Sequence, residues 1–184
     1  KGIVSTFWEI AKIAILTLVI VVPLRAFVFQ PFLVRGASME PNFHNGDYLI
    51  VDEFSYNFRE PERGEVIVFD FPNNPSQRYI KRIIGLPGET VEIEDGVITI
   101  FSAEGDKNST FKLNEIVYLP ASQQTAGSVK TELANDEYFV LGDNRQFSSD
   151  SRSWGSLPQD NIVGRVLIRL FPPNAFAKVE APEY

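Results

Sequence analysis

The sequence contains no cysteine, a single histidine and a single methionine. The lack of cysteine excludes a disulfide framework, a thiolate nucleophile and a zinc site with cysteine ligands. The one histidine, His44, is expected on a surface turn, and the carboxylates do not have the spacing of metal ligands, so we predict no metal and no other cofactor. Basic runs are also missing and the formal net charge is -7, so nucleic acid is not an expected partner.

Charge is distributed unevenly along the 184 residues. The first 35 residues carry four basic side chains and one acidic one, whereas residues 36–184 carry 13 basic and 23 acidic ones. A cationic, largely apolar N-terminal segment therefore precedes an acidic body. A chain of this length can form one domain with a substantial core together with such a segment.

The N-terminal segment has the composition of a membrane helix. Residues 13–24 contain no charged or strongly polar side chain, and the apolar character extends outward to Trp8 and Phe29. A bilayer core requires about 20 mostly apolar residues. We therefore predict that residues 1–30 form a membrane anchor. A cleaved signal peptide and a buried core helix are the alternatives. The signal peptide is less consistent with the sequence, because the residues around Leu24 and Arg25 are bulky where a cleavage site requires small ones.

Beyond Pro31 the sequence is typical of a mainly β protein with antiparallel sheets. Short alternating runs of Val, Ile, Phe and Tyr, bounded by turn residues, predict strands over residues 47–52, 65–71, 79–84, 90–94, 97–101, 137–141 and 162–171. Asp95-Gly96 lies between two of these runs and predicts a tight hairpin, because a type I′ turn requires positive φ at both central residues. Residues 31–184 are expected to form one domain, with residues 102–135 as a small, polar and irregular insertion.

Ser38 and Lys81 are the residues with the clearest chemical potential. A serine hydroxyl is a weak nucleophile until a base removes its proton, and a neutral lysine can be that base. At an ordinary pKa of about 10.4, only about 0.04% of a lysine side chain is neutral at pH 7, so burial would have to lower its pKa. Judged from these two residues alone, non-catalytic interpretations are also possible. Ser38 could be an ordinary surface serine, and Lys81 could be an edge-strand lysine that prevents aggregation.

A third cluster spans residues 142–152, which close a predicted strand and are rich in turn-forming and hydrogen-bonding side chains. A serine hydroxyl in this cluster could orient the Lys81 amine, while Asp150 and Arg152 could brace the loop. An ordinary polar loop with local ion pairs is the alternative interpretation.

Taken in order, these blocks resemble the bacterial type I signal peptidases, membrane-anchored serine proteases that remove signal peptides from exported proteins. The matching blocks lie at residues 36–41, 63–69, 79–89 and 142–152, followed by Trp154-Gly155. The resemblance implies a signal-peptidase-like β fold with an N-terminal transmembrane helix. It also implies that Ser38 is the nucleophile and that Lys81 is the general base of a Ser/Lys dyad.

The resemblance implies supporting roles as well. It assigns the lysine-orienting hydroxyl to Ser148, and it assigns support of the site to Asp143, Asp150 and Arg152. The backbone N–H of Ser38 should form part of an oxyanion hole. Gly36 stands where some members have a serine that supplies a second oxyanion donor, and Asn42 stands where threonine is frequent. The positions that line the pockets for small substrate side chains are Met39, Phe43, Tyr79 and Ile80.

The resulting expectation is a single-pass enzyme of a plasma or thylakoid-type membrane, with its catalytic domain on the extracytoplasmic side. Its partners would be signal-peptide-bearing preproteins, cleaved after small-x-small motifs and bound as an added strand, and membrane lipid, contacted through Phe32 and Phe43. Two other classes are possible. A self-cleaving regulator of the repressor type would have an N-terminal DNA-binding module, and a non-catalytic anchored β domain would use Ser38 and Lys81 only structurally.

Overall fold

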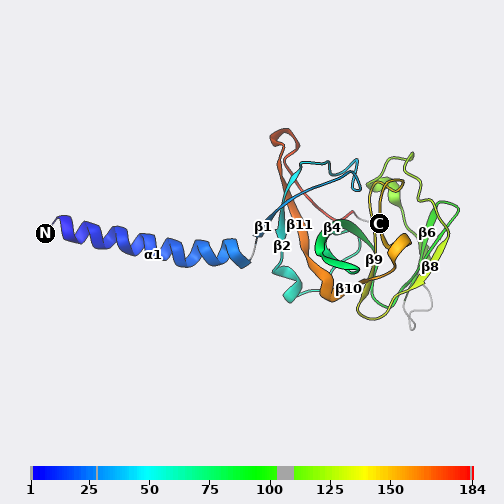
Figure 1. Ribbon diagram of the computed structural model, residues 1–184, viewed down its shortest axis with the longest axis horizontal. Helices are drawn as coiled ribbons and strands as arrows, with labels where there is room; N and C mark the ends of the chain where they lie inside the picture. The colour runs from blue at the N-terminus through cyan, green and yellow to red at the C-terminus, as the bar shows by residue number, and fades with distance from the viewer. Residues whose placement is uncertain (1, 28, 103–109, 183) are drawn as a thin grey trace.

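The computed structural model describes residues 2–27, 29–102, 110–182 and 184. A long helix, α1 (Ile3–Phe27), extends away from a body that consists mainly of antiparallel strands (Figure 1). The expected mainly β fold with antiparallel sheets is confirmed.

The strands of the body form two sheets. In order across the larger, eight-stranded sheet these are β1 (Phe29–Leu33), β2 (Tyr48–Asp52), β11 (Ile162–Phe171), β3 (Val66–Phe71), β4 (Asn74–Gly85), β9 (Glu137–Leu141) and β10 (Leu157–Pro158), with β12 (Ala177–Lys178) beside β11. The smaller sheet has the order β7 (Thr110–Lys112), β6 (Val97–Phe101), β5 (Thr90–Glu94) and β8 (Val129–Glu132). Figure 1 shows this smaller sheet on the side of the body away from α1. Short helical turns complete the body: α2 (Ser151–Trp154), η1 (Ser55–Asn57), η2 (Glu115–Val117), η3 (Gln159–Asn161) and η4 (Pro173–Ala175).

Helix α1 exposes large apolar side chains, among them Phe7, Trp8 and Leu16. Within the described part of the chain, none of the helices has the combined length and apolar character needed to cross a bilayer. The transmembrane anchor over residues 1–30 therefore stays a prediction.

All seven predicted strands are present, most within one residue of their expected ends. Asp95 and Gly96 have φ values of 49° and 82°, as the predicted hairpin between β5 and β6 requires. The exception is β4, which begins at Asn74 instead of residue 79. Its first residues are polar and exposed and include Pro75, so they lack the alternation that identifies a strand in a sequence.

The expectation of an irregular segment over residues 102–135 is wrong at two places. Strand β7 pairs with β6, and β8 pairs with β5, so these two short strands form the edges of the smaller sheet. An edge strand buries little of its surface and tolerates polar side chains, which is why its sequence looks like a loop.

The core beneath the candidate site contains side chains from the larger sheet and from the loop between β1 and β2. Its buried members are Val34, Met39, Phe43, Leu49, Val51, Val66, Val68, Ile80 and Val166. Because successive side chains of a strand point to opposite faces, burial of Ile80 in this cluster directs Lys81 to the other face of β4.

Candidate active site

The loop that carries Ser38 connects β1 to β2 and is fixed at both ends. The Val34 N–H donates to the Asp47 carbonyl over 2.9 Å, and the Asp47 carboxylate accepts a hydrogen bond from the His44 N–H over 2.9 Å. Met39 and Phe43 anchor the loop in the core, with exposed fractions of only 1% and 3%. The residues on either side of Ser38 are therefore held by packing, so its hydroxyl has a defined position.

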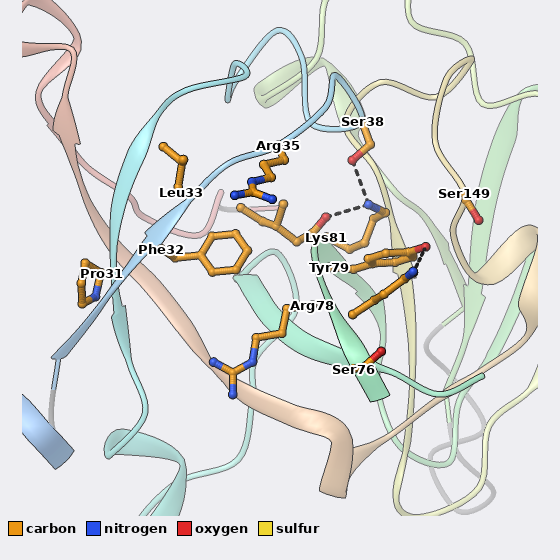
Figure 2. A pocket seen from close by; sticks show the side chains of 12 residues that line it. Pro31, Phe32, Leu33, Arg35, Ser38, Ser76, Arg78, Tyr79, Lys81 and Ser149 are labelled. Atoms are coloured by element: carbon orange, nitrogen blue, oxygen red, sulfur yellow. Dashed lines mark hydrogen bonds between the residues drawn. The ribbon is translucent and has the colours of Figure 1, made fainter. Parts of the chain in front are cut away.

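Lys81 approaches this serine from β4. Its side chain is almost completely buried, with 3% exposed. The amine Nζ lies 2.9 Å from the Ser38 Oγ and donates to the Ile80 carbonyl over 2.8 Å, as Figure 2 shows. The structure thus brings together the two residues that the sequence analysis identified as nucleophile and base.

Burial lowers the pKa of Lys81 to about 8, because desolvation disfavours the ammonium form. The carboxylates of Asp150 and Asp143 act in the opposite direction, but their effect is smaller. With this pKa about half of the amine is neutral at pH 8. A neutral amine at hydrogen-bonding distance from an alcohol can accept its proton as the oxygen attacks an electrophile.

The Ser38 backbone N–H is a candidate donor for a developing oxyanion. Among the described residues, no acceptor is found for the Ser38 N–H. The Gly36 N–H, by contrast, donates to the Asn45 Oδ1 over 3.0 Å. Gly36 has no side chain that could act as a second donor.

The segment 142–152 supports the site through two carboxylates. Asp143 accepts two hydrogen bonds from the buried guanidinium of Arg82, at 2.9 and 2.6 Å, and one from the Asn42 amide at 2.8 Å. Asp150 accepts from the Gly142 N–H at 3.1 Å and from the Arg152 Nε at 2.8 Å. Asn42, where the family often has threonine, is thus part of the same network.

Ser148 lies close to the site, but the expected hydrogen bond between its hydroxyl and the Lys81 amine is not formed. Its Oγ is buried and forms no hydrogen bond within the described part of the chain. The Lys81 amine is instead bonded to Ser38 and to the Ile80 carbonyl. A Cβ atom on Gly142 would clash with the Ser148 Oγ and would lie 2.5 Å from the Ser38 carbonyl oxygen, so Gly142 lies between the two serines. The lysine-orienting role of Ser148 stays a prediction.

Asn144 is a positioning residue that the sequence analysis missed. Its backbone N–H donates to the Ser38 carbonyl over 3.0 Å, and its side-chain amide donates to the Ala37 carbonyl over 3.0 Å. These two bonds hold the backbone of the loop at Ser38 and at the residue before it. The only signal in the sequence is its place in the polar cluster, because its partners lie more than a hundred residues earlier.

An open cavity of about 620 Å³ extends from Ser38 and Lys81 between β1 and β4 (Figure 2). Its lining consists of Pro31, Phe32, Leu33, Arg35, Ser38, Ser76, Gln77, Arg78, Tyr79, Ile80, Lys81 and Ser149. Tyr79 and Ile80, which are predicted to line the pockets for substrate side chains, both border this cavity. Met39 and Phe43 do not, because both are buried in the core beneath it, and the expectation that Phe43 contacts lipid is wrong for the same reason.

Two further features bear on the chemistry of the site, namely the single histidine and the grouping of possible metal ligands. His44 is exposed, as expected, and hydrogen-bonds through its backbone N–H to Asp47. Over the described residues, no three His, Asp or Glu side chains are grouped as metal ligands would be.

Comparison of the sequence with known proteins identifies signal peptidases as relatives. The model of the family described as "Signal peptidase, peptidase S26" matches residues 7–171. A probable signal peptidase I-2 of Synechocystis is 35% identical over 173 residues, which cover 91% of this chain and 75% of that protein. A signal peptidase I of Bacillus licheniformis is 33% identical over 186 residues, covering 96% of this chain and 95% of that protein. Among solved structures, a signal peptidase I from Enterococcus faecalis has 30% identity and a TM-score of 0.46, covering 58% of this chain and 97% of that one.

Proposed function

Because this chain belongs to the signal peptidase family, peptidase S26, we propose that it removes signal peptides from exported preproteins with Ser38 as nucleophile and Lys81 as general base. The observation that carries this proposal is the 2.9 Å distance between the Lys81 Nζ and the Ser38 Oγ in a buried environment. Serine proteases without a histidine base require such a partner for the hydroxyl.

The mechanism follows from this geometry. Neutral Lys81 accepts the proton of Ser38 as the Oγ attacks the scissile carbonyl carbon, and the carbonyl oxygen becomes an oxyanion. The Ser38 N–H, which has no acceptor among the described residues, stabilises that charge. A single donor of this kind contributes about 2.7–4 kcal/mol. The Lys81 ammonium then protonates the leaving amine, and the C–N bond breaks to leave an acyl ester on Ser38. Water, deprotonated by Lys81, hydrolyses this ester and restores the serine.

The arrangement of the strands supports binding of an extended substrate. Strand β1 is the last strand of its sheet, and the β9 partner of β4 begins only at Arg82. In the described part of the chain, β1 and residues 74–81 of β4 therefore each have one edge without a neighbouring strand, and the cavity lies between these two segments. A peptide can add to such edges as a further strand. Cleavage after small-x-small motifs is taken from the family resemblance.

Membrane attachment through residues 1–30 is part of the proposal, with the catalytic domain on the extracytoplasmic side of a plasma or thylakoid-type membrane. The exposed apolar side chains of α1 support attachment, since an exposed apolar surface of this kind commonly marks contact with lipid or another protein. Co-sedimentation of the full chain with phospholipid vesicles tests it, and a chain that stays in the supernatant would contradict it.

Cleavage of a peptide that carries Ala-x-Ala ahead of its scissile bond tests the catalytic assignment. The unmodified chain should cut after the second alanine, and Ser38→Ala and Lys81→Ala should each lower the rate by at least about a thousandfold. Ser128→Ala and Lys178→Ala are matched controls, because both residues are exposed and lie away from the cavity. Near-normal turnover by either dyad variant would contradict the assignment.

The two other function classes have weaker support. A self-cleaving regulator would combine its peptidase domain with a DNA-binding module, whereas residues 7–171 match the signal peptidase family model as one continuous stretch. A non-catalytic binding domain predicts no cleavage of the peptide by the unmodified chain, so the same assay decides between it and the peptidase.

A further inference from the structure

The charge of the cavity differs from that of the protein as a whole. The chain has a formal net charge of -7, yet the residues that line the cavity include Arg35, Arg78 and Lys81 and no aspartate or glutamate. Figure 2 shows Arg35 on the segment that leads to Ser38 and Arg78 on β4. An acidic protein thus has a cationic lining at its candidate substrate site.

Arg35 is exceptional among the arginines of the body. Every arginine from residue 59 to residue 169 lies within ion-pair distance of a carboxylate: Arg59, Arg63, Arg78, Arg82, Arg145, Arg152, Arg165 and Arg169. Arg35 is exposed, and within the described residues its guanidinium has no hydrogen bond or ion pair. The body has more carboxylates than basic side chains, yet none of the described ones pairs with Arg35. Its guanidinium can therefore bind an anionic group from another molecule.

Arg78 is partly available to the same group. Its Nε pairs with the Asp70 Oδ1 over 3.1 Å, and 47% of its side chain is exposed. The paired carboxylate reduces its contribution, so Arg35 is the stronger candidate for contact with an anionic ligand.

The position of Arg35 indicates which substrate side chain it meets. Val34 is buried and Arg35 is exposed, so the Arg35 side chain stands on the solvent side of the segment that borders the cavity. In an extended peptide, the two small residues of a small-x-small motif point to one face and the residue between them to the other. If the small residues face the buried side, where Ile80 lies, the middle residue faces the side of Arg35.

We infer that the residue between the two small ones is preferentially acidic, and that Arg35 selects it by an ion pair with its carboxylate. This inference rests on the proposed function, because it names a substrate feature of the same site. The pair is formed near the surface, so its effect is moderate and depends on salt.

Three peptides that differ only at the middle position test the inference: Ala-Glu-Ala, Ala-Gln-Ala and Ala-Lys-Ala, offered together in one reaction at low ionic strength. The kcat/KM values should fall in that order, with glutamate about three- to fivefold above glutamine and about tenfold or more above lysine. Near 1 M NaCl the glutamate-to-glutamine ratio should approach one, because salt screens an exposed ion pair.

Variants connect the preference to Arg35. Arg35→Gln should bring the glutamate-to-glutamine ratio close to one, and Arg35→Lys should retain part of it. Lys178→Gln removes another exposed positive charge away from the cavity and should leave the ratio as in the unmodified chain.

The outcomes separate this inference from the proposed function. If the unmodified chain cuts none of the peptides, the peptidase assignment itself fails. Equal cleavage of all three, or a preference that survives in Arg35→Gln, overturns only the charge selection. Loss of binding to anionic vesicles in Arg35→Gln with unchanged peptide ratios would assign the guanidinium to a lipid headgroup and would also overturn it.

Discussion

The pH dependence of turnover is the most direct consequence of the buried Lys81. Its pKa lies near 8 instead of the ordinary 10.5 because burial disfavours the ammonium form. This difference corresponds to about 3 kcal/mol. At pH 7 the neutral fraction is about 10%, against about 0.03% for an ordinary lysine, so burial alone increases the population of the reactive amine by about 300-fold.

The assay measures kcat/KM from pH 6 to pH 10 on a peptide without titratable side chains. The logarithm should rise with a slope of one and level off above about pH 8, where Lys81 is neutral. Activity that is still rising with unit slope at pH 10 would mean an unshifted amine and would refute the argument from burial. Circular dichroism at each pH serves as the control for unfolding.

The same shift has a stability consequence with a definite sign. Because the pKa of Lys81 is lower in the folded state, the unfolded chain binds more protons between about pH 8 and 10.5. The cost of burying the ammonium is therefore fully present below pH 8 and disappears as the pH rises toward 10.5. Lys81→Met, which has a similar length and no charge, should remove this cost.

Denaturant unfolding of both proteins across this range measures the effect. The stability difference between Lys81→Met and the unmodified chain should change by up to about 3 kcal/mol between pH 8 and 10.5, in favour of the unmodified chain as the pH rises. A difference that is independent of pH would contradict the shifted pKa even if the variant is inactive.

Three further substitutions test the support of the site. Gly142→Ala should lower kcat/KM on the order of a hundredfold with little loss of secondary structure, because its methyl group would lie 2.5 Å from the Ser38 carbonyl oxygen; a near-normal rate would show that the loop adapts freely. Asn144→Leu removes the side-chain hydrogen bond to the Ala37 carbonyl, in the loop that carries Ser38. It should lower the free energy of unfolding by about 1 kcal/mol and lower kcat more than it raises KM. A loss of stability with unchanged kinetics would show that Asn144 has only a structural role. Arg82→Met should destabilise the fold by about 3–5 kcal/mol in denaturant unfolding because it leaves the Asp143 carboxylate buried without its partner, and Asp143→Leu in addition should recover much of that loss; a single variant as stable as the double one would contradict the pairing.

Local patterns in the sequence were sufficient for most of the strands. Alternating burial and turn residues identify a strand wherever one face packs on a core, and the hairpin at Asp95-Gly96 depends only on positive φ at two adjacent residues. The same reasoning failed for β7 and β8, since edge strands with polar side chains have no alternating pattern to detect.

The candidate site was also predictable only in part from the sequence. Residue types and the order of the sequence blocks identified Ser38, Lys81 and the segment 142–152, because a nucleophile, a base and a polar loop are chemical properties of the residues themselves. Which side chains line the cavity could not be obtained from that information. Met39 and Phe43 lie within five residues of Ser38 in the sequence, yet they pack into the core, whereas Arg35 reaches the cavity.

The sequence by itself therefore determined the mainly β fold and the choice of Ser38 and Lys81 as the candidate nucleophile and base. Only the tertiary structure decided that the amine of residue 81 lies 2.9 Å from the hydroxyl of residue 38 in a water-poor environment and that Asn144 holds the loop that carries Ser38. It also decided that Arg35 has no ion-pair partner among the described residues. The physical reason is that desolvation, hydrogen bonding and ion pairing depend on neighbours in space, and these neighbours come from segments more than forty residues apart along the chain.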